Sequence, residues 1–258
     1  MNYKSIFNLL GILLGIFSLS FIPPLVLTFV YSESGKEIFL YSFIFFSILG
    51  ASIWVTTRQK KLSLNISDGF IITTLFWVVL ACAGSIPFYF YGLGISDAIF
   101  ESVSGITTTG ATTIVGLDNL PKSILLYRQL LQWIGGMGLI VLAVAVMPAL
   151  GIGGGQLYKM ELPGSHGNQK LTPKITDSAK ALWKIYVGLT LLCATLYLLS
   201  GMNLFDSIAH SLSTVAGGGF STHDASIGFF NSTLIETVCI VFMLLSAASF
   251  AVHYVAIF

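Results

Sequence analysis

The sequence predicts an all-α polytopic membrane protein, and its composition is the main reason. Of its 258 residues, 55% are hydrophobic and only 9% are charged, and the mean hydropathy is +0.88. In a soluble domain roughly a quarter of the residues are charged. A chain with so few charged residues cannot provide the polar surface that a soluble globular protein needs. The apolar residues also gather in stretches long enough to cross a bilayer as helices. These observations exclude a disordered chain and argue strongly against a soluble enzyme.

Six apolar stretches have the length of transmembrane helices. They cover residues 6–30, 38–57, 69–91, 124–148, 181–201 and 232–257. The first resembles a signal peptide, but it is long enough to span, contains Pro23 and Pro24, and lacks a small-residue cleavage site, so we expect it to be retained. The segments between the third and fourth stretches, and between the fifth and sixth, are neither fully apolar nor hydrophilic.

Basic residues lie mostly on one side of these six spans. If the N-terminus is cytoplasmic, only Lys36, Lys122 and Arg128 of the twelve Lys and Arg residues fall outside. The positive-inside rule therefore predicts a cytoplasmic N-terminus. Most of the acidic residues fall on the outer side instead, where they would concentrate cations. Acids also translocate more easily than bases, and this second explanation stays open.

The chain contains an internal repeat with an offset of 109 residues. The identical pairs are Gly92 and Gly201, Asp97 and Asp206, Ile99 and Ile208, Ser102 and Ser211, Ser104 and Ser213, Gly110 and Gly219, Thr113 and Thr222, and Ser123 and Ser232. Each unit contains two spans with a short apolar helix and a Thr/Gly-rich stretch between them. Two spans return the chain to the side of the membrane from which it started, so the two units have the same orientation. Units of the same orientation are related by an axis along the membrane normal. Their centres then face a common axis, as in a pore.

The Thr/Gly-rich stretches are the candidate ion-binding segments. Residues 107–113 follow a short helix that Asp97 can cap, and residues 216–222 follow one headed by Asp206. Non-helical backbone at membrane depth is tolerated where it is buried in protein or lines a watery cavity. Rings of carbonyl oxygens there suit a monovalent cation such as potassium. Neither stretch contains a carboxylate, which argues against a divalent-cation site.

At these residues the sequence resembles the TrkH/KtrB superfamily of potassium transporters, in its TrkH-type branch. The matching stretches are residues 100–113, 127–141 and 218–228, and the resemblance runs over essentially the whole chain. It implies repeated helix–pore loop–helix units of potassium-channel type, four around one pore, preceded by an extra two-helix hairpin. The implied parts are the hairpin (1–57), the first repeat (69–148), a cytoplasmic loop (149–180) and the second repeat (181–258).

The resemblance also implies a site and a function. Thr108, Thr109 and Gly110 would line the first quarter of a potassium selectivity filter. Gly217, Gly218 and Gly219 would line the second quarter. We expect potassium uptake across the bacterial inner membrane by the membrane subunit of a Trk-type system, with no cofactor and no enzymatic activity. The implied partners are a TrkA-type nucleotide-binding subunit, docking on residues 149–180, and a second copy in a homodimer. We expect no nucleic-acid partner.

The family has four repeats, whereas this sequence contains two. Two repeats supply half a ring and leave polar filter backbone facing lipid. The sequence also stops at Phe258, within an apolar stretch. We therefore expect a truncated part of a longer transporter. A regulatory half-transporter with no conduction of its own stays open, as does a pair of chains that completes the four repeats.

Arg128 and a cluster of glycines stand out in the fourth span. Arg128 is either a pore charge or an interfacial anchor, and its neighbours Tyr127 and Gln129 favour the anchor. The glycines at 135, 136 and 138 suit close packing against a short pore helix.

A remote alternative is an intramembrane serine protease that uses Ser104 and His210. Ser104 matches Ser213 in the repeat, whereas His210 matches Glu101. The pair therefore occupies non-equivalent positions, which disfavours a protease. We expect His210 to serve helix packing.

Overall fold

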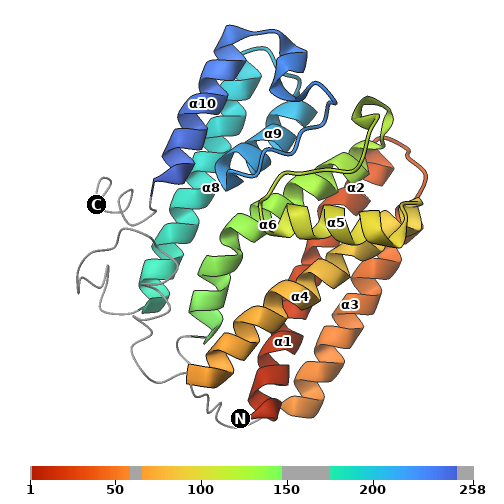
Figure 1. The fold of residues 1–258 in the computed structure, drawn as a ribbon, viewed down its shortest axis with the longest axis vertical. Coiled ribbons are helices and arrows are strands. Elements are labelled where there is room, and N and C mark those ends of the chain that lie inside the picture. Colours follow the sequence, from red (N-terminus) through yellow and green to blue (C-terminus); the bar gives the residue numbers. More distant parts are fainter. Residues whose placement is uncertain (1, 59–65, 147–174, 249–258) are drawn as a thin grey trace.

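The computed structural model describes residues 2–58, 66–146 and 175–248. These residues form helices and no strand. The helices are α1 (Tyr3–Ser18), η1 (Leu19–Phe21), α2 (Ile22–Val30), α3 (Lys36–Thr57), α4 (Ile66–Tyr91), α5 (Ile95–Ile106), η2 (Leu117–Asn119), α6 (Lys122–Val146), α8 (Ile175–Leu199), α9 (Leu204–Ala216), η3 (Ser226–Phe230) and α10 (Thr233–Ala247). Long helices lie side by side, and α5 and α9 are short helices among them (Figure 1).

Four helices are long and apolar enough to cross a membrane: Tyr3–Val30, Lys36–Thr57, Ser67–Tyr91 and Ala181–Leu199. They correspond to four of the six predicted spans. The fourth predicted span coincides with α6. The sixth, predicted over residues 232–257, is described as a helix only over α10, and its residues 249–257 lie outside the described residues.

Helix α8 begins at Ile175, earlier than the predicted start at residue 181. Residues 175–180 of the predicted loop are therefore helical. No Gly or Pro interrupts residues 174–187, so the helix extends into polar sequence beyond the apolar stretch. The rest of the predicted docking loop, residues 149–174, lies outside the described residues.

The first span is a helix with a tight turn at its centre. The turn η1 separates α1 from α2, whose first residues include Pro23. Proline lacks an amide hydrogen and clashes with the preceding turn, so a regular α-helix cannot run through this point. Helix α1 lies directly against α3: a Cβ atom on Gly50 would come within 2.8 Å of the carbonyl oxygen of Gly11. Small residues thus allow the two backbones to touch.

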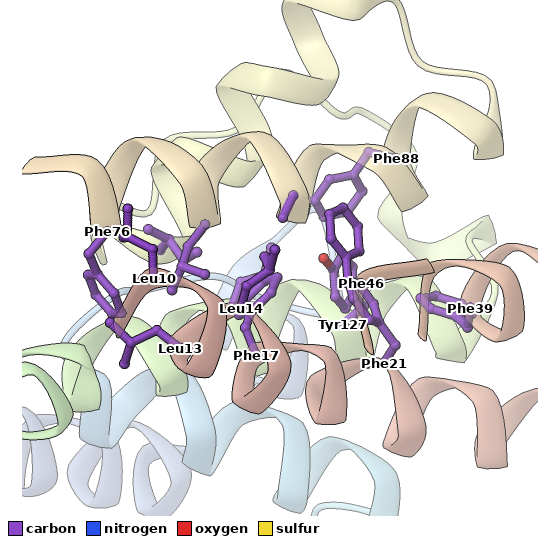
Figure 2. Packing of buried hydrophobic residues seen from close by; sticks show 14 of the residues in the cluster. Leu10, Leu13, Leu14, Phe17, Phe21, Phe39, Phe46, Phe76, Phe88 and Tyr127 are labelled. Carbon is purple, nitrogen blue, oxygen red and sulfur yellow. The ribbon is translucent and has the colours of Figure 1, made fainter. Parts of the chain in front are cut away.

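Aromatic side chains join this hairpin to the first repeat. Tyr127 of α6 lies between the rings of Phe21, Phe39 and Phe88, at centroid distances of 5.7, 5.6 and 5.2 Å (Figure 2). Its hydroxyl donates to the carbonyl oxygen of Gly84 in α4 at 2.9 Å. Edge-on and offset ring contacts of this kind stabilise a core beyond simple area burial. They hold the N-terminal part of α6 in a fixed position.

The two short helices begin before their acidic residues. Helix α5 has Gly94 as its N-cap, and Asp97 lies in its first turn. Helix α9 has Asn203 as its N-cap, and the side-chain oxygen of Asn203 accepts from the amide of Asp206 at 2.9 Å. The prediction that Asp97 caps its helix is therefore wrong. A carboxylate in the first turn still stabilises the positive end of a helix.

Candidate functional site

The candidate site is formed by the segments that follow the two short helices. We call residues 107–113 the first return segment and residues 216–222 the second return segment. Both begin at the C-terminal end of a short helix, α5 or α9. At 12 and 13 residues, these helices are about 18–20 Å long. Each can therefore reach roughly the middle of a bilayer.

Hydrogen bonds to α5 hold the first return segment. The amide of Thr109 donates to the carbonyl oxygen of Ser104 at 2.9 Å, and the hydroxyl of Ser104 donates to the carbonyl oxygen of Ala111 at 2.5 Å. Thr108 and Gly110 have positive φ values of 54° and 79°. A β-branched residue rarely adopts such a conformation, and rare backbone conformations concentrate at functional sites.

The second return segment has the same bonds 109 residues later. The amide of Gly218 donates to the carbonyl oxygen of Ser213 at 2.9 Å, and the hydroxyl of Ser213 donates to the carbonyl oxygen of Phe220 at 2.8 Å. Gly217 and Gly219 have φ values of 67° and 78°. The repeat seen in the sequence thus extends to individual hydrogen bonds and to backbone conformation.

The two return segments touch each other. A Cβ atom built on Gly110 would overlap the carbonyl oxygen of Gly218. Only a glycine allows the first return segment to approach the second so closely at this point. The structure therefore brings the six predicted filter residues together in two adjoining segments: Thr108, Thr109, Gly110, Gly217, Gly218 and Gly219.

Glycines of α6 support the ends of both short helices. A Cβ atom on Gly135 would overlap the carbonyl oxygen of Ile106, the last residue of α5. One on Gly136 would come within 3.3 Å of Ala216, the last residue of α9. The close packing expected of this glycine cluster is present, and it involves both short helices rather than one.

Arg128 is neither a pore charge nor an interfacial anchor. Its side chain is fully buried, and its Nε atom lies 2.6 Å from Oε1 of Glu101, which is also fully buried. Its neighbours Tyr127 and Gln129 are buried as well, so reading them as interfacial residues was wrong. Helices from the hairpin and from the second repeat cover this part of α6, which hydropathy alone does not reveal.

Ser104 and His210 have different partners. Ser104 donates to the carbonyl oxygen of Ala111. The imidazole of His210 lies 3.0 Å from the hydroxyl of Ser221 and 3.0 Å from the carbonyl oxygen of Asp206. The serine–histidine pair that a protease would need is not formed by these side chains. His210 instead ties α9 to the second return segment.

The family model described as TrkH, cation transport protein, matches residues 35–258. The chain belongs to the TrkH family. It is 50% identical to the Trk system potassium uptake protein TrkH of Vibrio parahaemolyticus, over 99% of this chain and 53% of that protein. It is 45% identical to the Trk system potassium uptake protein TrkG of Escherichia coli, over 99% of this chain and 53% of that protein.

A solved TrkH structure has the same fold. The crystal structure of the potassium transporter TrkH from Vibrio parahaemolyticus aligns with a TM-score of 0.84 and 47% identity. The alignment covers 98% of this chain and 52% of that one. This TrkH-family chain therefore spans about half the length of the relatives it matches.

A polar cluster around His223 of this TrkH-family chain was not predicted. The imidazole of His223 lies 2.5 Å from Asp118 and 3.2 Å from Asp206. Its ring stacks on Phe229 with a centroid distance of 3.5 Å. The hydrogen bond from His223 lowers the pKa of Asp118 below its ordinary value. The cluster joins the loop after the first return segment to the second repeat. The sequence offered no signal for the contact between Asp118 and His223, because these two residues lie 105 positions apart.

The atoms that the return segments could offer to an ion differ from the His, Cys, Asp and Glu side chains of a typical metal site. Within residues 2–58, 66–146 and 175–248, no group of three or more His, Cys, Asp and Glu side chains is arranged to hold a metal ion. The return segments of this TrkH-family chain instead offer carbonyl and hydroxyl oxygens. Such oxygens suit a weakly held monovalent cation.

Proposed function

We propose that this chain forms two quarters of the selectivity filter in the membrane subunit of a Trk-type system, which takes up potassium across the bacterial inner membrane. The observation that carries the proposal is the pair of adjoining return segments, with equivalent hydrogen bonds and equivalent positive φ values. The relatives named as potassium uptake proteins support potassium as the transported ion.

The backbone of the return segments provides the chemistry. Carbonyl oxygens of Thr108, Thr109 and Gly110 in one segment, and of residues 217–219 in the other, replace part of the hydration shell of the ion. The positive φ values direct successive carbonyls differently from an extended strand. The C-terminal ends of α5 and α9 carry partial negative charge, which favours a cation beside them.

Two further repeats complete the filter in this proposal. They come from the same longer polypeptide or from a second chain. The competing candidate is a half-transporter with no conduction of its own. Potassium uptake in a deficient bacterial strain separates the two through the complete four-repeat transporter, because uptake by it supports the proposal and absence of uptake supports the half-transporter. Residues 1–258 alone should give no uptake. Uptake by residues 1–258 alone, as a dimer, would favour paired chains instead.

The proposed assembly includes a TrkA-type nucleotide-binding subunit on the cytoplasmic side and a second copy of the transporter. Its support is the family membership of the chain. Deleting part of residues 149–174 should abolish copurification of the TrkA-type subunit while the homodimer persists. Unchanged copurification would place the contact elsewhere.

Three matched glycine substitutions test the filter assignment in the complete transporter. Gly110→Ser and Gly219→Ser alter the return segments, and Gly116→Ser is the control. Gly116 and Gly219 have φ values of 80° and 78°, and neither has a heavy atom within 4 Å of its built Cβ, so serine strains both alike. We expect potassium-over-sodium selectivity to fall by about tenfold or more in the two filter variants. It should stay unchanged in Gly116→Ser. Unchanged selectivity in both filter variants would refute the assignment.

A further inference from the structure

One buried guanidinium touches both return segments. Arg128 of α6 donates through Nη1 to the carbonyl oxygen of Ser221 at 2.9 Å and through Nη2 to the hydroxyl of Thr112 at 3.1 Å. Its guanidinium carbon also lies 4.3 Å from the centre of the Phe220 ring. Thr112 belongs to the first return segment, and the other two residues belong to the second.

Glu101 completes this arrangement from α5. Its carboxylate lies 2.6 Å from Nε of Arg128 and accepts from the hydroxyl of Thr112 at 2.8 and 3.0 Å and from the amide of Thr113 at 3.4 Å. A buried ion pair is tolerable only when further hydrogen bonds satisfy its remaining donors and acceptors. Here those additional bonds all go to the return segments.

The two contact points are equivalent in the repeat. Thr112 and Ser221 differ by 109 positions, and each lies two residues after a positive-φ glycine, Gly110 or Gly219. Arg128 therefore connects matching points of two neighbouring segments. One turn further along α6, the side-chain oxygen of Gln132 accepts from the amide of Phe220 at 3.0 Å. Helix α6 therefore binds the second return segment through two residues that lie one helical turn apart.

The charged pair occurs once in the two repeats. The residue equivalent to Glu101 is His210, which lies 3.0 Å from Ser221. The residue equivalent to Arg128 is Thr237, whose hydroxyl donates to the carbonyl oxygen of Thr233 in its own helix. Within the described residues the ion pair thus marks the junction of the first and second repeats and no other place.

We infer that Arg128 and Glu101 are positioning residues that set the separation of the two return segments and thereby the ion selectivity of the filter. The inference rests on the proposed function. Selectivity depends on how carbonyl oxygens are spaced around the ion. A planar guanidinium holds three acceptors in one fixed geometry, and the ammonium group of lysine cannot reproduce that fork.

The test compares Arg128→Lys and Thr112→Val with Tyr127→Phe in the complete transporter. Thr112→Val removes only the shared hydroxyl from an exposed residue, so it should fold even if Arg128→Lys does not. Tyr127→Phe is the matched control, because it removes a buried α6 hydrogen bond, to Gly84, without contact to either return segment. The measurements are melting temperature and competition of sodium with potassium uptake.

We expect potassium-over-sodium selectivity to fall by about tenfold in both Arg128→Lys and Thr112→Val. Tyr127→Phe should lower the melting temperature and leave selectivity unchanged. Unchanged selectivity in Thr112→Val, or in folded Arg128→Lys, would overturn the inference. If selectivity is unchanged in those two variants but falls in Gly110→Ser, only the inference about Arg128 and Glu101 is refuted and the proposed function still holds. A parent protein that transports no potassium would instead refute the proposed function.

Discussion

At the scale of single residues, backbone conformation distinguishes the return segments. Thr108 adopts a φ of 54° where the second repeat has Gly217 at 67°. The first repeat therefore maintains a strained threonine at a position where glycine is the unstrained choice. Its neighbours Thr107 and Thr109 share a hydroxyl–hydroxyl hydrogen bond of 2.7 Å. Because Thr108 is present although glycine would avoid this backbone strain, we interpret the threonine-rich sequence as serving the site rather than the fold.

The contact of His223 with Asp118 gives a pH-dependent prediction. Asp118→Asn should lower the melting temperature in detergent by roughly 1–2 °C at neutral pH. The hydrogen bond lowers the pKa of Asp118 in the folded protein. The stabilisation is therefore present above the ordinary carboxyl pKa of about 3.9 and is lost as the pH falls through the lowered folded value. Melting curves of the parent and Asp118→Asn should converge at that low pH, and a constant difference would contradict the assignment.

At the scale of helices, small residues and caps determine which elements touch. Glycines of α6 place it against the ends of α5 and α9. The carboxylate of Glu33, between α2 and α3, accepts from the amides of Lys122 and Ser123 at 2.7 and 3.1 Å. These amides belong to the first turn of α6, so the hairpin supplies a cap to the first repeat.

The glycine contact predicts opposite effects of two similar substitutions. Gly135→Ala should destabilise the protein by about 1–3 kcal/mol, because its methyl group overlaps the carbonyl oxygen of Ile106. Gly188→Ala in α8 is the control, since nothing lies within 4 Å of its built Cβ. It should be neutral or stabilise the helix by up to about 1 kcal/mol. Thermal unfolding in detergent measures both, and equal effects would contradict the packing.

The cap predicts a smaller change. Glu33→Gln should cost about 1 kcal/mol, because it removes the charge at the N-terminus of α6 and weakens one of two hydrogen bonds. Glu37→Gln, at an exposed position in the first turn of α3, is the matched control with a weaker effect. Hydrogen exchange at the Lys122 amide should accelerate only in Glu33→Gln. Acceleration in neither variant would refute the cap.

At the scale of the whole molecule, three parts meet at one end of the bundle. The ammonium group of Lys122 lies 3.9 Å from the ring centre of Tyr31 in the α2–α3 connection and 5.3 Å from that of Phe205 in α9. The cation thus contacts an aromatic ring from the hairpin and one from the second repeat. The loops that contain Glu33 and Asp118 lie at this end, opposite the N-terminus (Figure 1).

The proposed orientation predicts the labelling of single cysteines introduced after replacement of the three native ones. Ser34→Cys, between α2 and α3, and Ser226→Cys, at the start of η3, are at exposed positions and should react with an impermeant maleimide in intact cells. Lys4→Cys, near the N-terminus, should react only after the cells are permeabilised. This pattern follows from the positive-inside rule, because nine of the twelve Lys and Arg residues lie on the same side of the predicted spans as the N-terminus. Labelling of Lys4→Cys in intact cells would reverse the topology.

The membrane class, the offset of 109 residues and six spans could be predicted from the sequence alone, and four of those spans are helices of spanning length in the described residues. Hydropathy and repetition are properties of the chain read in order, so they need no knowledge of packing. The short helices before the Thr/Gly stretches could also be predicted, because polar residues interrupt the apolar sequence there. The cap of α5 could not, since Gly94 carries no signal beyond ordinary turn composition, whereas Asn203 is a preferred N-cap residue and could have indicated the start of α9.

The contacts of Arg128 and His223 could not be predicted from the sequence, because they depend on how the helices pack. The residues next to Arg128 in the sequence favoured a position at the membrane surface. In the structure, Glu101, Thr112 and Ser221 surround its side chain in the interior. These partners lie 16 to 93 positions away along the chain. The free energy of a buried charge depends on which donors and acceptors surround it in space, and sequence order does not specify those neighbours. The sequence thus identified the segments that form the candidate filter, and the packing of α6 decided how they are held together.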